Sequence, residues 1–317
     1  MPTVELTLTK MSWNLQMKIL RSKFLVATEN FEAVFRALAH VQKCYSSSIR
    51  RVVRGRRRLT FILMMLAILF PLHVLVPLAY YFFMRRVAEK KPWNLSLDGT
   101  YQPKVTMIIP TFNESGVIVK KLQNLEKIDY PEDKLEVIIV DSASIDGTAE
   151  IADNYIKTNA FSFKVLILRE EHRRGKAKAL NLALQYATGD IIATSDADSY
   201  WEPSSLRRAL PFIADPQVGA VTGREVITNV GQSIYTLAEG SYGKFGSTIR
   251  WGESKLNSTL IFQGELSLYK RNAFRKFEDE KGSDDTGTVI NIVSAGYRTI
   301  FVPSAVFYDA VPYTLRG

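Results

Sequence analysis

The chain has 317 residues, a formal net charge of +9, one cysteine and three histidines. Because Cys44 is the only cysteine, an intrachain disulfide and a thiolate metal cage are excluded. The histidines are scattered without ligand spacing, so a metal bound by this chain would be held by oxygen atoms. The length suits one large domain or two smaller ones.

Residues 1–57 form an N-terminal extension that is amphipathic and basic. Residues 24–41, FLVATENFEAVFRALAHV, carry apolar residues at helical spacing and predict an amphipathic helix, which could lie on a bilayer or pack on the main domain. Residues 50–58, RRVVRGRRR, hold six arginines. Arginines beside an apolar segment favour anionic lipid headgroups as partners. Nucleic acid is disfavoured, because no aromatic residues interleave with the arginines and no nucleic-acid-binding motif is present.

An apolar segment follows, and it runs for 26 residues, from Leu59 to Met84, without a formal charge. A helix of this length reaches roughly 39 Å, enough to cross a ~30 Å hydrocarbon core. Pro71 and Pro77 lie inside it, and membrane helices tolerate proline better than soluble helices do. A buried core helix is the alternative, but core helices seldom run so long without charge. We therefore predict a transmembrane segment over residues 58–86.

The basic clusters on the two sides of this segment bear on its orientation. The larger one precedes it, so the positive-inside rule predicts that residues 1–57 stay in the cytoplasm. A single span would then export everything after it. Residues 87–104 contain turn-forming residues and predict a linker to the next domain.

From Val105 onward, short apolar strands alternate with helices. The predicted helices cover Glu114–Lys127, Asp146–Lys157 and Lys176–Ala187. The predicted strands are VTMII (105–109), LEVIIVD (135–141), FKVLIL (163–168) and DIIATSD (190–196). This alternation predicts an α/β fold in which helices cover both faces of a mostly parallel sheet.

Polar residues follow the predicted strands, where open parallel sheets bind their ligands. The segments are PTFNE (110–114), DSAS (141–144), REEHRRGKAKALN (169–181) and SDADS (195–199). One such segment could be a simple turn, but several together favour a shared site. Glycine-rich phosphate motifs are missing from the sequence, which argues against a dinucleotide oxidoreductase and a P-loop ATPase. The D-x-D pair suits a hard ion such as Mg²⁺ or Mn²⁺, which takes few protein carboxylates and completes its shell with phosphates and water.

The motifs IIPTFNE, IIVDSASIDGT, GKAKALNLAL and SDAD, in this order, resemble those of glycosyltransferase family 2, the nucleotide-sugar enzymes with the GT-A (Rossmann-like) fold. VGAVTGREVITN, FQGELSLYKRNAF and residues 283–317 resemble the hyaluronan, chitin and cellulose synthase branch. The resemblance covers 105–317 and implies one GT-A domain there. That branch continues with a Gln-x-x-Arg-Trp motif and further membrane helices, whereas this sequence stops at Gly317. Either it is a fragment, or the protein lacks that motif.

The resemblance implies roles on the donor side of the site. Asp141 would meet the uracil or ribose of a UDP-sugar, and Asp196 would lie at the nucleotide. Asp198 would bind the metal that bridges the diphosphate, and Lys176 would neutralise phosphate charge. The alternative for Lys176 is a solvated lysine in the first turn of a helix. Further donor-side residues are Pro110, Thr111, Asn113 and Glu114.

On the acceptor side, the resemblance implies that Asp285 is the general base. It would deprotonate the acceptor hydroxyl as this attacks the anomeric carbon, in a single displacement that inverts the configuration. A helix N-cap or first-turn carboxylate is the alternative for Asp285, and the two interpretations are compatible, because Asp284 could be the cap while Asp285 is catalytic. Gly264, Glu265 and Asp284 belong to the same side, and we interpret Asp309 as structural.

Together these features predict a membrane-bound inverting glycosyltransferase that uses a UDP-sugar and Mg²⁺ or Mn²⁺ in polysaccharide synthesis, with a saccharide or lipid-linked acceptor. One alternative is transfer of a single sugar to a lipid phosphate of the dolichyl-phosphate type. Another is a non-catalytic protein that binds nucleotide sugars. We expect the plasma membrane as location, with the catalytic domain in the cytoplasm, where UDP-sugars are made. This conflicts with the orientation of a single span, and missing spans, a re-entrant segment or an exterior N-terminus would each resolve it.

Overall fold

The computed structural model describes residues 56–159, 161–280 and 283–312. The amphipathic helix predicted within residues 1–57 lies outside the described residues. The chain divides into two compact units, one that ends at Ala79 and one that begins at Tyr80.

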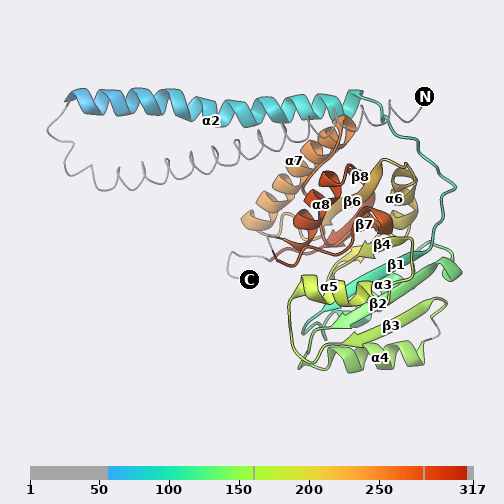
Figure 1. Ribbon diagram of the computed structural model, residues 1–317. Helices are drawn as coiled ribbons and strands as arrows, with labels where there is room; N and C mark the ends of the chain where they lie inside the picture. The colour runs from blue at the N-terminus through green and yellow to red at the C-terminus, as the bar shows by residue number, and fades with distance from the viewer. Residues whose placement is uncertain (1–55, 160, 281–282, 313–317) are drawn as a thin grey trace, which may run out of the picture. The chain divides into compact units, whose positions relative to one another are not determined.

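The described part of the first unit is helical. It belongs to α2 (Arg56–Lys90), a continuous helix of 35 residues with Pro71 and Pro77 inside it (Figure 1). By length and composition, Leu63–Lys90 is long and apolar enough to cross a membrane. From Leu63 to Leu78 its large apolar side chains are exposed, Phe70 at 70% for example. The helix continues through residues 87–90, the start of the segment in which the sequence predicts a linker.

The second unit is built on one eight-stranded sheet with the strand order β3-β2-β1-β4-β7-β6-β8-β5. The strands are β1 (Val105–Thr111), β2 (Leu135–Asp141), β3 (Lys164–Arg169), β4 (Ile191–Thr194), β5 (Tyr200–Trp201), β6 (Val218–Ile227), β7 (Ser267–Lys270) and β8 (Arg298–Asp309). β1 pairs in parallel with β2 and β4, β2 with β3, and β6 with β8. β7 runs antiparallel to β4 and β6, and β5 antiparallel to β8. The predicted mostly parallel sheet is confirmed.

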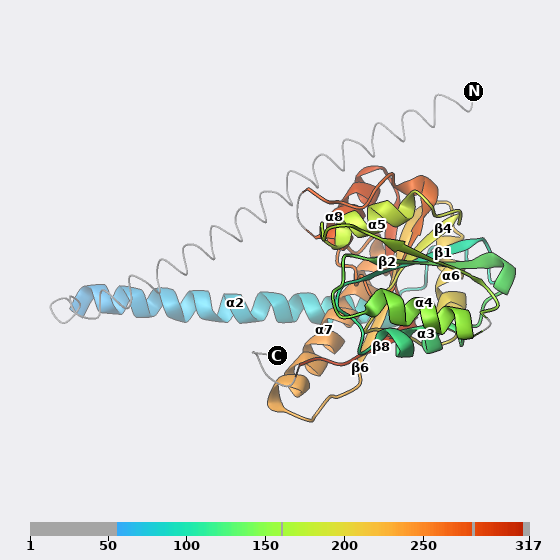
Figure 2. The same ribbon diagram turned by 90° about the horizontal axis from the view of Figure 1, so that it is seen from below.

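Helices cover both faces of this sheet (Figure 2). They are α3 (Ile118–Leu125), α4 (Thr148–Thr158), α5 (Lys176–Leu184), α6 (Ser205–Ile213), α7 (Ile234–Leu256) and α8 (Asp284–Ser294), with 3₁₀ turns η2 (Glu132–Lys134) and η3 (Arg271–Ala273). One core cluster joins Met107 and Ile109 of β1 to α3, α4 and α6. The other joins Ile108 to α5 and α8. Alternate residues of β1 thus face opposite layers, as the pleat of a strand requires.

The first predicted helix is shorter than expected. Its observed form, α3, begins at Ile118, whereas the sequence predicts a start at Glu114. The Glu114 N–H donates to Thr148 Oγ1 and the Ser115 N–H to Asp146 Oδ2. These bonds hold residues 114 and 115 in a turn against the start of α4.

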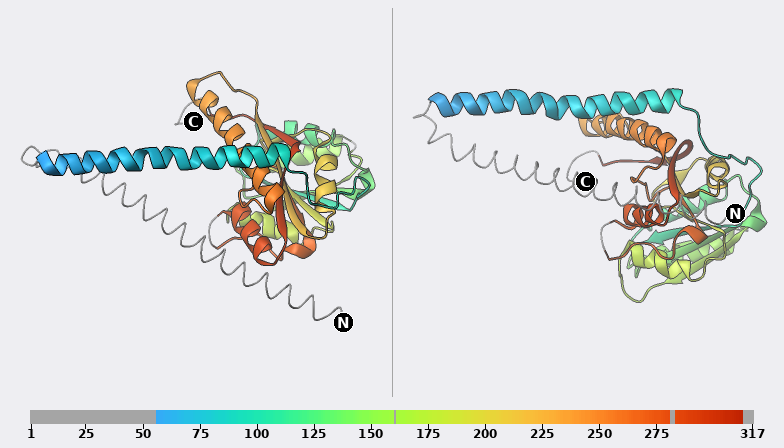
Figure 3. Two further views of the ribbon diagram at one scale, coloured as in Figure 1. Left: turned by 90° about the horizontal axis from the view of Figure 1, so that it is seen from above. Right: turned by 45° about the horizontal axis from the view of Figure 1, so that its top comes forward.

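The last residues of α2 belong to the second unit and pack on α7 (Figure 3). The Tyr81 ring stacks on Phe245 with centroids 4.6 Å apart. Lys255 Nζ donates to the carbonyl of Ala88 at 2.6 Å. Met84 and Ala88 are buried. Residues 80–90 are therefore a structural part of the globular unit.

Candidate active site

The first two strands bring their carboxyl ends together. In the β1–β2 register, Thr111 lies opposite Asp141. Thr111 Oγ1 donates to the carbonyl of Val140 at 3.2 Å and is 3.5 Å from Asp141 Oδ1. Pro110 is the adjacent residue of β1, in register with Val140. Asp141 is buried, and its Oδ2 accepts the N–H of Ser144 at 3.1 Å.

The loops that follow these strands hold each other. The Asn113 N–H donates to Ser144 Oγ at 2.9 Å, and Asn113 Oδ1 accepts the Ile145 N–H at 3.0 Å. Asn113 has a φ of 57°, in the left-handed region that asparagine tolerates better than most residues. This conformation lets one residue bond the neighbouring loop through both its backbone and its side chain.

Residues Ser195–Ser199, here named the DAD turn, follow β4. Ser195, Ala197 and Ser199 are buried, Asp196 is half-buried and Asp198 is exposed. Asp198 therefore faces solvent, whereas Asp196 is partly covered and its Oδ1 atom is buried. Burial raises the pKa of the Glu114 carboxyl, and the charges of Asp198, Asp146 and Asp196 add to the rise. Glu114 is therefore within electrostatic range of both the DAD turn and the first loops.

Lys176 pairs with Asp196. Its Nζ lies 2.6 Å from Asp196 Oδ1 and 2.8 Å from Oδ2. Burial lowers the Lys176 pKa, but the charge and hydrogen bond of Asp196, together with the charges of Asp284 and Glu265, outweigh it, so the pKa is raised. Lys176, the first residue of α5, therefore places a protonated ammonium group beside the DAD turn.

Gly264 lies against this lysine. A Cβ atom at Gly264 would be 3.0 Å from Lys176 Nζ and 4.0 Å from Asp285 Oδ2. The absence of a side chain lets the backbone, the ammonium group and the Asp285 carboxylate approach one another. At the next residue, burial raises the pKa of Glu265 to about 7, helped by the charge of Asp196.

The start of α8 carries the two predicted acceptor-side carboxylates. Asp285 Oδ1 accepts the Thr286 N–H at 2.6 Å and a hydrogen bond from the Ser283 hydroxyl. Burial raises the pKa of Asp284, against the charge of Lys176, which lowers it. Asp285 therefore serves its own helix through one oxygen and has its other oxygen toward Gly264.

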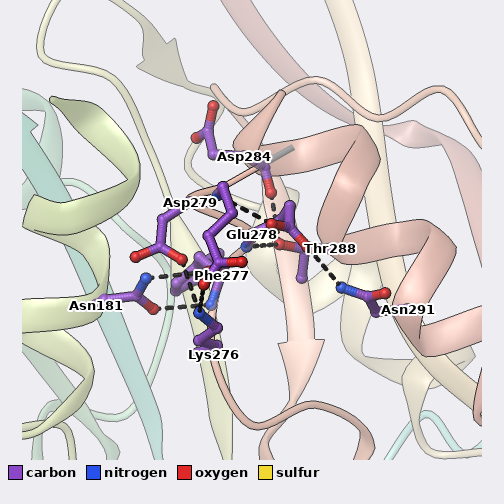
Figure 4. Close-up of polar contacts among 9 residues, drawn as sticks. Asn181, Lys276, Phe277, Glu278, Asp279, Asp284, Thr288 and Asn291 are labelled. Carbon is purple, nitrogen blue, oxygen red and sulfur yellow. Dashed lines mark hydrogen bonds and ion pairs between the residues drawn. The ribbon is translucent and has the colours of Figure 1, made fainter. Parts of the chain in front are cut away.

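A hydrogen-bond network ties α5 to this helix start (Figure 4). Asn181 Nδ2 donates to the carbonyl of Phe277 at 3.0 Å, and Asn181 Oδ1 accepts the Phe277 N–H at 2.8 Å. Thr288 Oγ1 donates to the carbonyl of Asp284 and accepts the Glu278 N–H. The helix that carries Lys176 and the helix that carries Asp285 are thereby held in fixed relation.

The model of the family "Glycosyl transferase family 2" matches residues 106–277. The chain belongs to glycosyltransferase family 2. The match covers all the donor-side residues and Gly264, and it ends before α8.

Within family 2, the chain is 40% identical to a mannosyltransferase from Pyrobaculum calidifontis solved with GDP-Man and Mn²⁺, with a TM-score of 0.70 over 79% of this chain and 68% of that one. It is 27% identical over 230 residues to the probable glycosyltransferase YdaM of Bacillus subtilis, covering 68% of this chain and 52% of that protein. It is 26% identical over 246 residues to a poly-beta-1,6-N-acetyl-D-glucosamine synthase of Staphylococcus epidermidis, covering 75% and 57%. The chain thus spans little more than half the length of these curated relatives.

Two polar residues near the family 2 motifs were not assigned a site role from the sequence. Burial raises the pKa of Asp309 to about 6, and the charges of Asp198, Glu225 and Asp196 contribute. Asp309 ends β8, which runs parallel to β6. The second residue is Lys121, a lysine on the apolar stripe of α3.

Proposed function

We propose that this protein transfers a sugar from a nucleoside diphosphate donor to an acceptor hydroxyl with inversion at the anomeric carbon. The observation that carries the proposal is the position of Lys176. Its ammonium group pairs with the donor-side carboxylate of Asp196 and also lies close to the Gly264 backbone, which the acceptor-side carboxylate of Asp285 also approaches. Such a site has a group for the leaving diphosphate and a group for the incoming hydroxyl.

The donor would lie along the carboxyl ends of β1, β2 and β4. Asp141 and the loop residues Thr111 and Asn113 would contact the nucleoside. Lys176 would receive the negative charge that builds on the diphosphate as its bond to the sugar breaks. In the same step Asp285 would take the proton of the acceptor hydroxyl, whose oxygen forms the new bond to the anomeric carbon.

Asp198 fits a metal ligand. It is exposed, and within the described residues its carboxylate forms no hydrogen bond or ion pair, so its oxygens are available to a hard cation. The described residues contain no cluster of three or more His, Cys, Asp or Glu that could hold a metal. We therefore propose that Mg²⁺ or Mn²⁺ binds to Asp198 together with donor phosphates. The bound cation would neutralise diphosphate charge.

The identity of the donor is open to direct test. The relative solved with GDP-Man has the higher identity to this chain, so GDP-mannose is the first donor to assay. UDP-sugars, which the resemblance to polymer synthases predicts, form the second group. The resemblance to the poly-beta-1,6-N-acetyl-D-glucosamine synthase favours a saccharide acceptor and polysaccharide synthesis.

We also propose that α2 anchors the protein in the cell membrane with the second unit on the cytoplasmic side. The length and composition of Leu63–Lys90 support a membrane span. Basic residues at its end, Arg85, Arg86, Lys90 and Lys91, would meet anionic headgroups.

The test is an assay of the full chain in detergent or vesicles with GDP-mannose, UDP-glucose and UDP-N-acetylglucosamine, each with Mn²⁺ and with EDTA. We expect metal-dependent transfer from at least one donor, and product sizing then separates a polymer from a single transfer to a lipid phosphate. Donor binding without release of nucleoside diphosphate, with every acceptor class supplied, would instead support a non-catalytic binding protein.

A further inference from the structure

A lysine lies buried beneath the DAD turn. Lys121 of α3 has none of its surface exposed, although its neighbour Lys120 is exposed. Lys121 occupies a position in the apolar stripe formed by Ile118, Leu122 and Leu125. Burial of an ammonium group is unfavourable unless hydrogen bonds and opposite charges compensate. Its contacts must therefore account for its presence.

The Lys121 ammonium group binds both ends of the DAD turn. Its Nζ donates to Ser195 Oγ at 2.6 Å and to the backbone carbonyl of Ser199 at 2.6 Å. Both serines have none of their surface exposed. The Ser199 hydroxyl also donates to the carbonyl of Asp196 at 3.2 Å. The two carboxylates of the turn are thus carried by a loop whose first and last residues share one cation.

This cation lies behind the acidic side of the site. Burial lowers the pKa of Lys121 to about 7, and the charges of Asp196, Asp198 and Asp309 act against that lowering. Carboxylates gathered at one edge repel one another. The protonated form of Lys121 beneath them offsets part of that repulsion.

The same helix holds the residues after the turn. Asn124 Nδ2 donates to the carbonyl of Trp201 at 2.8 Å, and Asn124 Oδ1 accepts the Trp201 N–H at 2.9 Å. Together with Lys121, this gives α3 three fixed points along residues 195–201. The conformation of residues 195–201 is therefore fixed by hydrogen bonds to α3, which belongs to the core layer beneath them.

We propose that Lys121 is a positioning residue of the donor site, which fixes the ends of the DAD turn so that Asp196 and Asp198 face the diphosphate and its cation. The inference rests on the proposed function, in which these two carboxylates serve the donor. Partners that orient metal ligands typically contribute 10- to 100-fold to metal affinity or activity. Loss of the Lys121 ammonium should therefore have an effect of about that size.

The test replaces the ammonium group by an apolar side chain of similar length, Lys121→Met, in the full chain. We expect the apparent Kd for Mn²⁺, measured with GDP and with UDP, to rise by about 10- to 100-fold. The KM for the donor should rise more than kcat falls. Lys120→Met makes the same substitution and the same charge loss on the exposed side of α3, and should change these values by no more than about twofold.

A second control removes another buried ammonium group. Lys255→Met, on α7, loses the hydrogen bond from Nζ to the carbonyl of Ala88 on α2, and should lower the melting temperature while Mn²⁺ affinity stays at the wild-type value. If Lys121→Met behaves in the same way, Lys121 only supports the core and the proposal is wrong.

If Lys121→Met does not fold, Ser195→Ala provides the test, because it removes one of the two acceptors and keeps the charge. Weaker Mn²⁺ binding by Ser195→Ala supports the proposal, and unchanged binding overturns it. A wild-type protein that binds neither GDP nor UDP in the presence of Mn²⁺ would contradict the proposed function itself, and this inference with it.

Discussion

Asp196 and Asp198 lie two residues apart and have different partners. Asp196 pairs with Lys176, whereas Asp198 is exposed. Asp198→Asn should therefore weaken Mn²⁺-supported nucleotide binding by more than about 100-fold, since even residues behind the ligands contribute 10- to 100-fold. The fold should stay intact. Titration calorimetry with GDP or UDP, with and without EDTA, measures this. Equal affinities for wild type and variant would refute the metal assignment.

Asp285 combines a helix-end contact with a position beside Gly264. Asp285→Asn keeps an oxygen that can accept the Thr286 N–H but removes the proton acceptor. We expect transfer to fall by about 10²- to 10⁴-fold, with near-normal nucleotide affinity. The lost charge at the helix start should cost only about 0.3–1 kcal/mol. Melting temperature, nucleotide affinity and transfer, measured on one preparation, provide the check.

A different result at Asp285 would assign it to the helix alone. Full transfer with lowered stability would mean that another group takes the acceptor proton. Asp284→Asn is the matched control for Asp285→Asn. It removes a carboxylate one residue earlier in the same turn, and the charge of Lys176 acts on that carboxylate.

Glu265 predicts a pH dependence of stability. Burial raises its pKa from 4.5 to about 7, and the charges of Asp196 and Glu225 add to the rise, against Lys176. Between these two pH values the folded protein keeps a proton that the unfolded chain has lost, so the free energy of unfolding falls as pH rises. Glu265→Gln cannot titrate. It should lose less stability than the wild type between about pH 4.5 and 8, as followed by denaturant unfolding without donor or metal. Parallel curves for the two proteins would contradict the shift.

The residues assigned from the sequence and those missed differ in a physical way. Lys176, Asp198 and Asp285 could be proposed from the sequence because their segments resemble family motifs at strand ends or helix starts. Lys121 was missed because a lysine in the middle of a predicted helix is ordinarily solvated, and only the fold shows that this position faces the core.

At the scale of elements, apolar runs in the sequence predict the strand bounds well. The ends of the helices are predicted less well. β2 has its predicted bounds, Leu135–Asp141, because a fully buried strand is apolar throughout. α3 is short because Thr148 and Asp146 accept the N–H groups of Glu114 and Ser115 and hold these two residues in a turn before the helix. The direction of β7 was not predictable, since a buried strand of four residues has the same composition whichever way it runs.

The link between α5 and the α8 segment supplies a prediction at this scale. Asn181→Leu removes both hydrogen bonds to the Phe277 backbone and leaves buried polar groups without partners. We expect a loss of about 2–5 kcal/mol in unfolding free energy. Transfer by the folded fraction should also fall, because Lys176 and Asp285 depend on this link for their spacing.

Asn181→Asp and Asn154→Ala are the controls. The first keeps an acceptor for the Phe277 N–H and should lose less stability. The second changes an exposed residue of α4 and should be neutral within about 0.5 kcal/mol. Wild-type transfer by the Asn181→Leu protein would show that the link serves stability alone.

At the scale of the whole molecule, the boundary of the globular unit decides how it should be truncated. A fragment of residues 80–317 keeps Met84 and Ala88, which are buried, whereas a fragment of residues 92–317 loses them. We expect the longer fragment to melt about 4–8 °C higher. Equal melting temperatures would show that the end of α2 adds nothing to the unit.

The same fragments test membrane attachment. Both lack the apolar residues before Tyr80 and should leave the membrane fraction after a high-salt wash. Retention of either fragment would mean that the globular unit itself binds lipid. The exposed side chains Ile234, Leu237 and Tyr242 of α7 are the surface to change first, since each is more than half exposed.

The pairing of the edge strand β5 affects how late during its synthesis the enzyme can become active. Tyr200 and Trp201 follow the DAD turn directly, yet their partner strand is β8, where they lie opposite Tyr308 and Phe307. At about 5–20 residues per second, a ribosome needs roughly 5–20 s to add the intervening stretch. A nascent chain can therefore pair β1 to β4 with one another while β5, which follows Asp196 and Asp198, still lacks its partner strand β8. Newly made protein would consume no nucleotide sugar until β8 has emerged.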